Sequence, residues 1–414
     1  MDVPQAAETI RTRCCIVGGG PAGMMLGLLL ARQGIEVLVL EKHADFLRDF
    51  RGDTIHPSTL EVMHELGFLE DFLSRPHQEA RTVTVTVGDS ALTLGDFSHL
   101  PTRCKFIALM PQWDFLDFLV DHAREYPHFH LRMQAEATEL IEAEGQVTGV
   151  RVSTPEGPLD VRADLVVAAD GRRSIIREKA GLQVMDIGAP MDVLWMRLPR
   201  VPDDPDQLQG RIVAGQMLVL IDRGDYWQCA FVIPKGSLAT IRQEGLEAFR
   251  AKLARLAPFL GSRVQELRGW DDIKLLTVTV DRLRQWFRPG LLCIGDAAHA
   301  MSPIGGIGIN LAIQDAVATA NILGPALRNG PVDPDRLAAV QKRRESPTRL
   351  TQGLQVLIQN RMISRVLGSR NSSIAPPWPL RMLAKWPPFR RIPARIVGMG
   401  FRPEHVLSGA HLDV

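Results

Sequence analysis

The sequence predicts an α/β fold: an α/β domain made of non-contiguous pieces, an inserted β-rich domain and a C-terminal helical, basic extension. Two observations support it. Strand–helix alternation near both ends encloses a strand-rich middle, and the segment from Ser346 to Pro403 has ten basic residues and no acidic one. The expected domains are residues 1–80, 104–185 and 280–345 for the first, 81–103 and 186–279 for the second, and 346–414 for the extension.

Hydrophobic spacing places the individual elements in order. Apolar runs or alternation predict strands, and apolar residues three or four apart predict helices. The helix expected at 311–323 should stop at Gly324-Pro325. The expected strands are 13–17, 35–41, 83–87, 165–169, 193–198, 211–221 and 226–233, and the expected helices are 21–33, 58–69, 113–126, 241–256 and 311–323.

Composition excludes several classes of protein. The 48 basic and 47 acidic residues leave a net charge of +1, which argues against a nucleic-acid clamp. Five cysteines without CxxC spacing indicate a reducing compartment and argue against a disulfide framework or a metal site. The apolar segment 14–31 is rich in glycine, so it reads as a buried strand–turn–helix rather than a membrane span, and no secretion signal is recognisable. We therefore expect a cytoplasmic protein without metal.

The strongest local motif is Gly18-Gly19-Gly20-Pro21-Ala22-Gly23, between the first expected strand and helix. Gly18 allows a tight turn, Gly20 lets a pyrophosphate approach the backbone, and Gly23 lets helix and strand pack closely. The helix start at Pro21 and Ala22 offers N–H groups to phosphates. Glu41, followed by Lys42, ends the next strand where an acid accepts both ribose hydroxyls. The motif predicts FAD or NAD rather than NADP; the alternative is a glycine-rich turn without a ligand.

Two further motifs favour FAD. One strand ends in Asp170-Gly171, and another ends in Gly295-Asp296 before a loop from Pro303 to Asn310 that enters a helix. A carboxylate at a strand end can hold ribityl or ribose hydroxyls. A glycine-rich loop at a helix start offers N–H groups to the pyrimidine end of a flavin, which an NAD dehydrogenase does not need.

The three motifs, in this order and spacing, resemble the group A flavoprotein monooxygenases, the family of para-hydroxybenzoate hydroxylase. The resemblance implies a Rossmann-like FAD-binding domain of the glutathione-reductase type. It implies that Asp296 binds the ribityl chain, that Asp170 and Gly171 serve FAD and NAD(P)H, and that Arg51 and Gln112 contact FAD. The residues expected to face the isoalloxazine are Gly306, Gly308, Ile309 and Asn310. The family often has glutamine where this chain has Ile307.

The resemblance also implies a reaction. FAD takes electrons from NADH or NADPH, reacts with O2 to give a flavin 4a-hydroperoxide, and transfers one oxygen atom to an organic substrate. No side chain is assigned as catalytic, and no second Rossmann unit is expected for the electron donor. The alternatives are a flavin-dependent halogenase, a polyprenyl reductase and a non-catalytic flavin-binding sensor.

A substrate pocket is expected between the inserted sheet and the flavin. Its candidate residues suggest an apolar or aromatic small molecule: Trp195, Gln216, Leu218, Trp227, Cys229, Phe231 and Pro303. The basic extension is expected to wrap onto the more acidic remainder of a monomer or homodimer. The alternatives for it are weak peripheral contact with a membrane, as its interleaved basic and aromatic residues would allow, and self-association.

Overall fold

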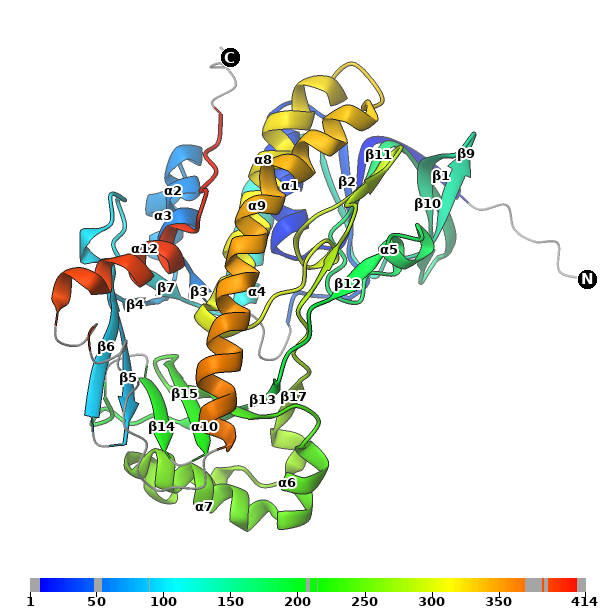
Figure 1. Cartoon of the computed structure of the whole chain (residues 1–414). Helices are drawn as coiled ribbons and strands as arrows, with labels where there is room; N and C mark the ends of the chain where they lie inside the picture. Colours follow the sequence, from blue (N-terminus) through cyan, green and yellow to red (C-terminus); the bar gives the residue numbers. More distant parts are fainter. Residues whose placement is uncertain are drawn as a thin grey trace, which may run out of the picture.

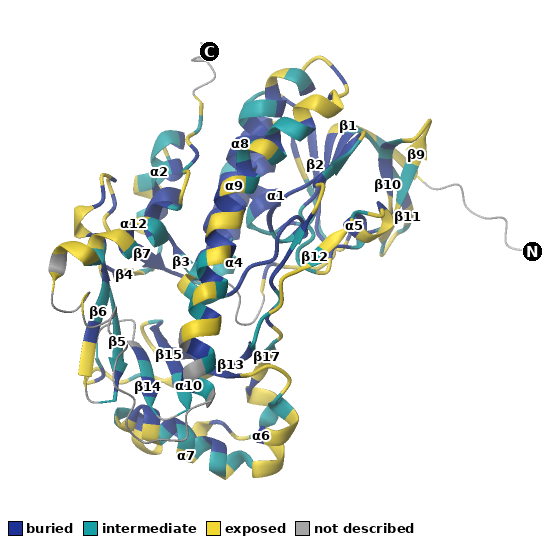
Figure 2. Ribbon diagram, viewed as in Figure 1, coloured by how far each residue is buried: buried dark blue, intermediate teal, exposed yellow. Residues whose placement is uncertain are grey.

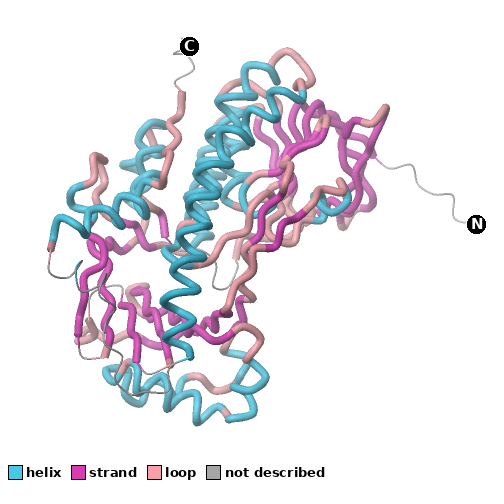
Figure 3. Tube along the Cα trace, viewed as in Figure 1, coloured by secondary structure: helices cyan, strands magenta, loops and turns pink. Residues whose placement is uncertain are grey.

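The computed structural model describes residues 8–47, 54–88, 90–205, 209–213, 215–368, 382 and 386–407, and it shows a mixed α/β protein built on two large sheets (Figure 1). The strands form two groups joined by a long helix (Figure 3). In the first sheet, β1 lies between β11 and β2, and all four pairs along β20-β11-β1-β2-β8 are parallel. This sheet contains β1 (Glu8–Val17), β2 (Val37–Leu40), β8 (Phe129–Arg132), β9 (Glu136–Ala143), β10 (Gln146–Thr154), β11 (Gly157–Ala168), β19 (Phe287–Arg288) and β20 (Leu291–Cys293).

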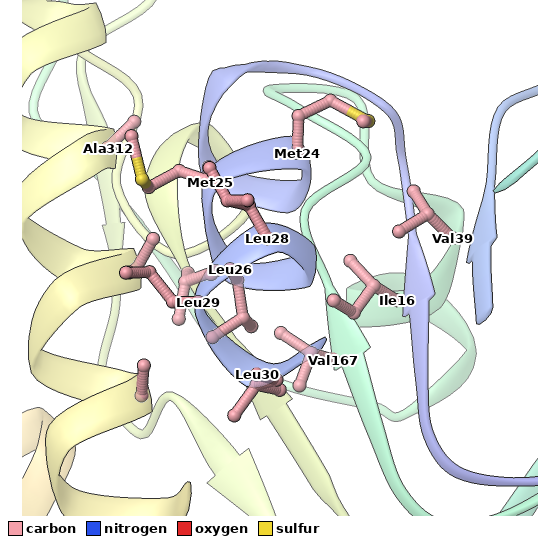
Figure 4. Close-up of a cluster of buried hydrophobic side chains, with 14 of the residues drawn as sticks. Ile16, Met24, Met25, Leu26, Leu28, Leu29, Leu30, Val39, Val167 and Ala312 are labelled. Atoms are coloured by element: carbon pink, nitrogen blue, oxygen red, sulfur yellow. The ribbon is translucent and has the colours of Figure 1, made fainter. Parts of the chain in front are cut away.

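Helix α1 (Pro21–Arg32) is buried around nearly its whole circumference. It lies against the first sheet and contacts α4 (Gln112–Ala123) and α8 (Gly308–Leu327). Met25 and Leu29 face α8, whereas Ile16, Val39 and Val167 come from the sheet side (Figure 4). A helix that is apolar all round has to be covered on every side, which is why segment 14–31 resembles a membrane span in sequence. In the described part of the chain, no helix has the length and apolar character needed to cross a bilayer.

The second sheet is mostly antiparallel and is covered on one face by α6 (Leu238–Glu244) and α7 (Leu246–Leu256). Its buried strands and the exposed outer side of α7 are visible in Figure 2. The strand order is β17-β13-β16-β15-β14-β5-β6. The strands are β5 (Thr82–Val87), β6 (Ser90–Asp96), β13 (Met191–Pro199), β14 (Gln209–Val213), β15 (Gln216–Asp222), β16 (Tyr226–Pro234) and β17 (Lys274–Leu276).

A long helix and several shorter elements lie between and beside the two sheets. Helix α9 (Pro334–Ile358) leads through a π-helical turn, η6 (Gln359–Ile363), into α10 (Ser364–Gly368), while η7 (Pro387–Arg390) and α12 (Arg391–Met399) pack beside β6 and α2 (Figure 1). The remaining elements are β3 (Thr54–Ile55), α2 (Pro57–Leu66), α3 (Leu69–Ser74), β4 (Gln78–Ala80), β7 (Ile107–Leu109), α5 (Ile175–Lys179), β12 (Val184–Asp186) and β18 (Asp281–Leu283).

Three sequence expectations about elements are corrected by the structure. The run 211–221 forms two antiparallel strands, β14 and β15, rather than one. The run 241–256 forms two helices, because Gly245 adopts a φ of 90° that an α-helix cannot include. Helix α8 continues through Gly324-Pro325 to Leu327, where a proline in the last turn removes few helical hydrogen bonds.

All five cysteines are buried free thiols. Burial raises the pKa of the Cys15 thiol to about 12, and it raises the pKa values of Cys14, Cys104, Cys229 and Cys293 as well. Since the thiolate is the reactive form, we expect the folded protein to be almost inert toward the thiol reagent DTNB. All five thiols should titrate after unfolding in guanidinium chloride. Rapid native reaction of even one cysteine would contradict this packing.

Candidate active site

The carboxyl ends of three adjacent parallel strands meet at one edge of the first sheet. Strand β11 pairs with both β1 and β20, so the segments that follow Val17, Ala168 and Cys293 lie side by side. In an open parallel sheet, ligands bind outside this edge. All three predicted cofactor motifs therefore lie next to one another, although they come from distant parts of the sequence.

The first glycine loop, residues 18–20, connects β1 to α1. Gly18 has a φ of 108°, and a Cβ atom there would lie 2.4 Å from the carbonyl oxygen of Ala169. A Cβ on Gly23 would lie 2.0 Å from the carbonyl oxygen of Gly18. A Cβ on Gly20 would meet no protein atom within 4 Å. Packing within the protein thus explains why positions 18 and 23 are glycine. At position 20 the protein itself leaves room for a side chain, so a requirement for glycine there would come from a ligand.

Glu41 joins the second strand to the first glycine loop. Its carboxylate accepts hydrogen bonds from the backbone N–H groups of Gly19 and His43, each at 3.0 Å, and the residue is buried. Lys42 beside it is exposed. Helix α1 begins without a side-chain cap, so its first N–H groups face outward at the same place. An acid and a bare helix start, set side by side, suit the ribose and the phosphates of a dinucleotide.

Two further carboxylates follow β11 and β20. Asp170 accepts a hydrogen bond from the backbone N–H of Ile176 at 3.3 Å, while burial raises the pKa of its carboxyl. Its other oxygen, Oδ1, is buried without a hydrogen-bond partner among the described residues. Gly171 has a φ of 85°. Asp296 is half-buried and lies 3.4 Å from the guanidinium of Arg172. A buried acceptor without a protein donor fits a ligand that brings hydroxyl groups.

The second glycine loop, residues 300–307, leads from β20 to α8. Pro303 is half-buried, and Gly305 and Gly306 adopt φ values of 76° and 62°. A Cβ on Gly306 would lie 2.2 Å from Thr54 Oγ1, which donates a hydrogen bond to the Gly306 carbonyl. Helix α8 starts at Gly308 and Ile309 without a side-chain cap. The loop therefore places backbone N–H groups of a helix start at the same edge.

The side chain of Asn310 makes four hydrogen bonds within the protein. Its Oδ1 accepts hydrogen bonds from the backbone N–H of His56 at 2.8 Å and from the hydroxyl of Thr59 at 2.7 Å. Its Nδ2 donates to the carbonyl oxygens of Thr54 and Gly306. The amide thus ties β3 to the second glycine loop, and only the backbone of Asn310 is left to face a cofactor.

Gln112 and Arg51 are the two remaining residues that were expected to contact FAD. Gln112 is half-buried and opens α4, which packs against α1. Arg51 lies outside the described residues. Among the described residues, no group of three or more histidine, cysteine or acidic side chains is arranged to hold a metal ion.

The predicted substrate residues do not share one face of the second sheet. Trp227, Cys229 and Phe231 belong, with Leu218, to the core that the sheet forms with α7, which contributes Phe249 and Leu253. Gln216 lies on the same face of β15 as Leu218 and pairs with Val213, which packs on that core. These five residues thus lie on the face that the helices cover. Both faces of the strands are apolar, so alternation in the sequence does not tell which face that is.

The opposite face of the second sheet looks toward the second glycine loop. Val232 and Met191 pack with Ile363, and Ile304 of the loop lies against this cluster. Trp195, the remaining predicted substrate residue of the sheet, is on this face, near Val219 and Val397. The contact between the loop and this face of the sheet is therefore made by apolar side chains.

A buried ionic network, which sequence reasoning missed, lies behind the second glycine loop. Arg344 donates to Asp315 Oδ1 at 2.9 Å and to Glu404 Oε1 at 3.0 Å, and His299 Nε2 lies 2.6 Å from Asp315 Oδ2. Burial alone would raise the pKa of Asp315, but the charge and hydrogen bonds of His299 and Arg344 hold it below its usual value. Asp315 also accepts a hydrogen bond from the Gly295 N–H at 3.0 Å. His299 therefore braces the turn rather than facing a substrate.

Comparisons with known proteins agree with this geometry. The sequence model of a family described as "FAD binding domain" matches residues 11–353. A 6-methylpretetramide 4-monooxygenase of Streptomyces rimosus is 32% identical over 94% of this chain and 93% of its own length. The crystal structure of p-nitrophenol 4-monooxygenase PnpA from Pseudomonas putida DLL-E4 superposes with a TM-score of 0.76, at 21% identity, over 95% of this chain and 100% of that one. The myxobacterial chondrochloren halogenase CndH gives a TM-score of 0.71 at 20% identity over 83% and 82%.

Proposed function

We propose, from the premise that this chain belongs to the FAD-binding-domain family and is a flavoprotein monooxygenase, that its substrate is a polycyclic aromatic molecule. The enzyme uses FAD, and NADH or NADPH is the electron donor typical of its family. The observation that carries the proposal is the meeting of the first glycine loop, Asp170 and Asp296 at one sheet edge, together with the contact of the second glycine loop with an apolar face of the second sheet. A dinucleotide site beside an apolar face suits a flavin enzyme acting on an apolar substrate.

The proposed FAD contacts extend along this edge. The first glycine loop and the start of α1 would hold the pyrophosphate, Glu41 the ribose, and Asp296 the ribityl chain. The second glycine loop and the start of α8 would hold the pyrimidine end of the flavin. The proposed contact residues are Gly18, Gly20, Pro21, Ala22, Gly23, Glu41, Lys42, Arg51, Gln112, Asp170, Gly171, Gly295, Asp296, Pro303, Gly306, Gly308, Ile309 and Asn310.

The chemistry divides between cofactor and protein. Bound FAD supplies two-electron acceptance from the nicotinamide and the activation of O2. The residues of this chain hold the cofactor, orient the substrate and exclude water. Trp195, which is half-buried on the sheet face toward the second glycine loop, offers apolar surface for the last two tasks. We assign no side chain as a general base or nucleophile.

The substrate class rests on two observations. The relative at 32% identity is named for 6-methylpretetramide, and the match extends over nearly the whole of both chains. The sheet face opposite the second glycine loop carries methionine, valine and tryptophan. A large, flat, apolar substrate would resemble the compound for which this relative is named, and it would pack on the apolar sheet face. A small ionised substrate would leave its charge without a partner on that face.

The finer architecture is also proposed. The second sheet, with residues 81–103 and 186–279, would act as the inserted substrate-binding domain, and residues 346–414 as the basic extension. Ala394 and Met399 of α12 pack against Phe97 and Leu100, which supports the wrapped arrangement of the extension. Peripheral membrane contact, and the choice between monomer and homodimer, stay predictions.

The test is oxygen incorporation by the purified holoenzyme. The protein should carry FAD, and NADH or NADPH oxidation in air should accelerate when 6-methylpretetramide is added as a probe, with p-nitrophenol as a monocyclic control. Under 18O2 the product should gain one labelled oxygen atom. A protein without flavin would contradict the family assignment itself.

The same experiment separates the alternative activities. A halogenase would need halide for turnover, and a polyprenyl reductase would consume no O2. A sensor would bind flavin but show no substrate-dependent oxygen uptake. A labelled product from p-nitrophenol alone would overturn the proposed substrate class while leaving the monooxygenase reaction in place.

A further inference from the structure

Helix α9 buries a polar face. After Val340, its buried residues other than Pro347 are polar: Arg344, Thr348, Thr351, Gln352 and Gln355. Gln359, at the start of the π-helical turn, continues the series and is fully buried. A buried amide is unfavourable unless it is hydrogen-bonded, so each of these glutamines needs a partner. Their partners show what this face of the helix does.

The three glutamines bind the first half of the second glycine loop and the strand beside it. Gln355 Nε2 donates to the carbonyl oxygens of Ser302 at 3.0 Å and Ile304 at 2.9 Å. Gln359 Nε2 donates to the hydroxyl of Ser302 at 2.6 Å. One turn earlier, Gln352 Nε2 donates to the carbonyl oxygens of Asp281 at 2.7 Å and Ala300 at 3.0 Å. Pro303 lies between the two carbonyl groups that Gln355 holds.

The loop has little regular structure of its own at this point. Its two glycines have positive φ values, and its second half is fixed separately by Thr54 and Asn310 at Gly306. The carbonyl groups of Ser302 and Ile304 accept hydrogen bonds from the side chain of Gln355, in place of the backbone hydrogen bonds that a helix or a strand would supply. The position of Pro303 therefore depends on α9 on one side and on β3 on the other.

The same helix also reaches the second sheet. Beyond Gln359 the chain continues through η6 into α10, and Ile363 and Leu367 pack against Met191 and Val232 on the sheet face described above. Figure 1 shows α9 running from beside α8 down to α10, next to β14 and β15. One continuous helical segment thus contacts both walls of the proposed substrate space.

We propose that Gln355 and Gln359 are positioning residues that fix the second glycine loop relative to the second sheet. The polar face of α9 thereby determines the position of Pro303 relative to the face of the second sheet that carries Met191 and Val232. The proposal deepens the proposed function, because it rests on that loop facing the flavin. Buried hydrogen bonds of this kind demand one register between two packed elements, which an apolar contact would not.

Gln355→Met and Gln359→Met test the proposal, since methionine keeps the length of the side chain and removes the donor. Gln341→Met is the matched control. Gln341 lies on the same helix and also binds backbone, donating to the Arg284 carbonyl and accepting from the Trp286 N–H, each at 3.0 Å, away from the loop. The first readout is hydrogen exchange of peptides covering 300–306 in FAD-free protein. The second is the FAD dissociation constant, with the visible circular dichroism of bound flavin.

In Gln355→Met we expect protection in 300–306 to fall about tenfold and FAD to bind roughly tenfold more weakly, with an altered flavin dichroism. Gln359→Met should do the same more weakly, and Gln341→Met should leave all three readouts unchanged. Equal protection of 300–306 in Gln355→Met and Gln341→Met would overturn the proposal. A wild-type protein that binds no FAD would instead overturn the proposed function, because the exchange comparison needs no flavin.

Discussion

Replacing Gly20 by valine will abolish FAD binding and leave the fold intact. The backbone of Gly20 has φ −77° and ψ −177°, an extended conformation open to any residue, and a Cβ there meets no protein atom within 4 Å. A side chain would instead occupy the space that the proposed pyrophosphate needs. We expect affinity for FAD to fall by roughly a hundredfold or more, measured by fluorescence titration. The urea unfolding midpoint of the FAD-free protein should stay close to that of the wild type.

Gly23→Val is the contrasting variant in the same loop. A Cβ at Gly23 would lie 2.0 Å from the Gly18 carbonyl oxygen, so this substitution must displace backbone. We expect it to destabilise the FAD-free protein itself by about 1–3 kcal/mol, as overpacking in a rigid core does. Normal FAD binding by Gly20→Val would show that the first glycine loop is not the phosphate site.

Arg344→Met will cause the largest loss of stability. Arg344 is fully buried and donates to Asp315, Glu404, Gln314 and the carbonyl oxygen of Arg402. Removing Arg344 takes the fully buried cation away from two buried carboxylates and leaves Asp315 with His299 as its remaining charged partner, and loss of a buried ion-pair partner costs about 3–5 kcal/mol. Urea denaturation of the FAD-free protein, monitored by tryptophan fluorescence, measures the change.

Arg343→Met provides the matched control for this prediction. Arg343 is the preceding residue and binds the same carboxylate, Glu404, at 2.7 and 2.9 Å, but its side chain is 35% exposed. Its loss leaves Glu404 paired with Arg344, so we expect about 1 kcal/mol or less. Equal losses in the two variants would mean that burial of Arg344 is not what makes the network important.

The glycine motifs could be predicted because they are local. β1, the first glycine loop and α1 depend on residues close in sequence, and the structure ends β1 at Val17 and starts α1 at Pro21, as expected. The FAD-binding assignment likewise follows from three short motifs, each read at its own strand end. Parallel pairing then brings the three ends together without further information from the sequence.

Features that depend on distant neighbours could not be predicted. Both faces of β15 and β16 are apolar, so the sequence does not tell whether Cys229 or Ala230 faces the helices. The contacts of helix α9 could not be predicted for the opposite reason. Its buried face is polar, so Arg344 and Gln355 look like solvent-facing residues until their partners, Asp315 and the carbonyl of Ser302, are known. The same ambiguity explains why Gln216, which was expected to line the substrate pocket, lies on the face of the sheet that α7 covers.

The long-range partners of β1 and Arg344 have a consequence for the order in which the protein is made. Glu8 at the start of β1 pairs with Leu159, and Arg344 binds both Asp315 and Glu404. During synthesis, the charge of Arg344 can therefore be neutralised at both carboxylates only after residue 404 has left the ribosome. Because contacts so far apart in sequence form slowly, we expect this part of the nascent chain to stay incomplete, and exposed to chaperones and proteases, until that point.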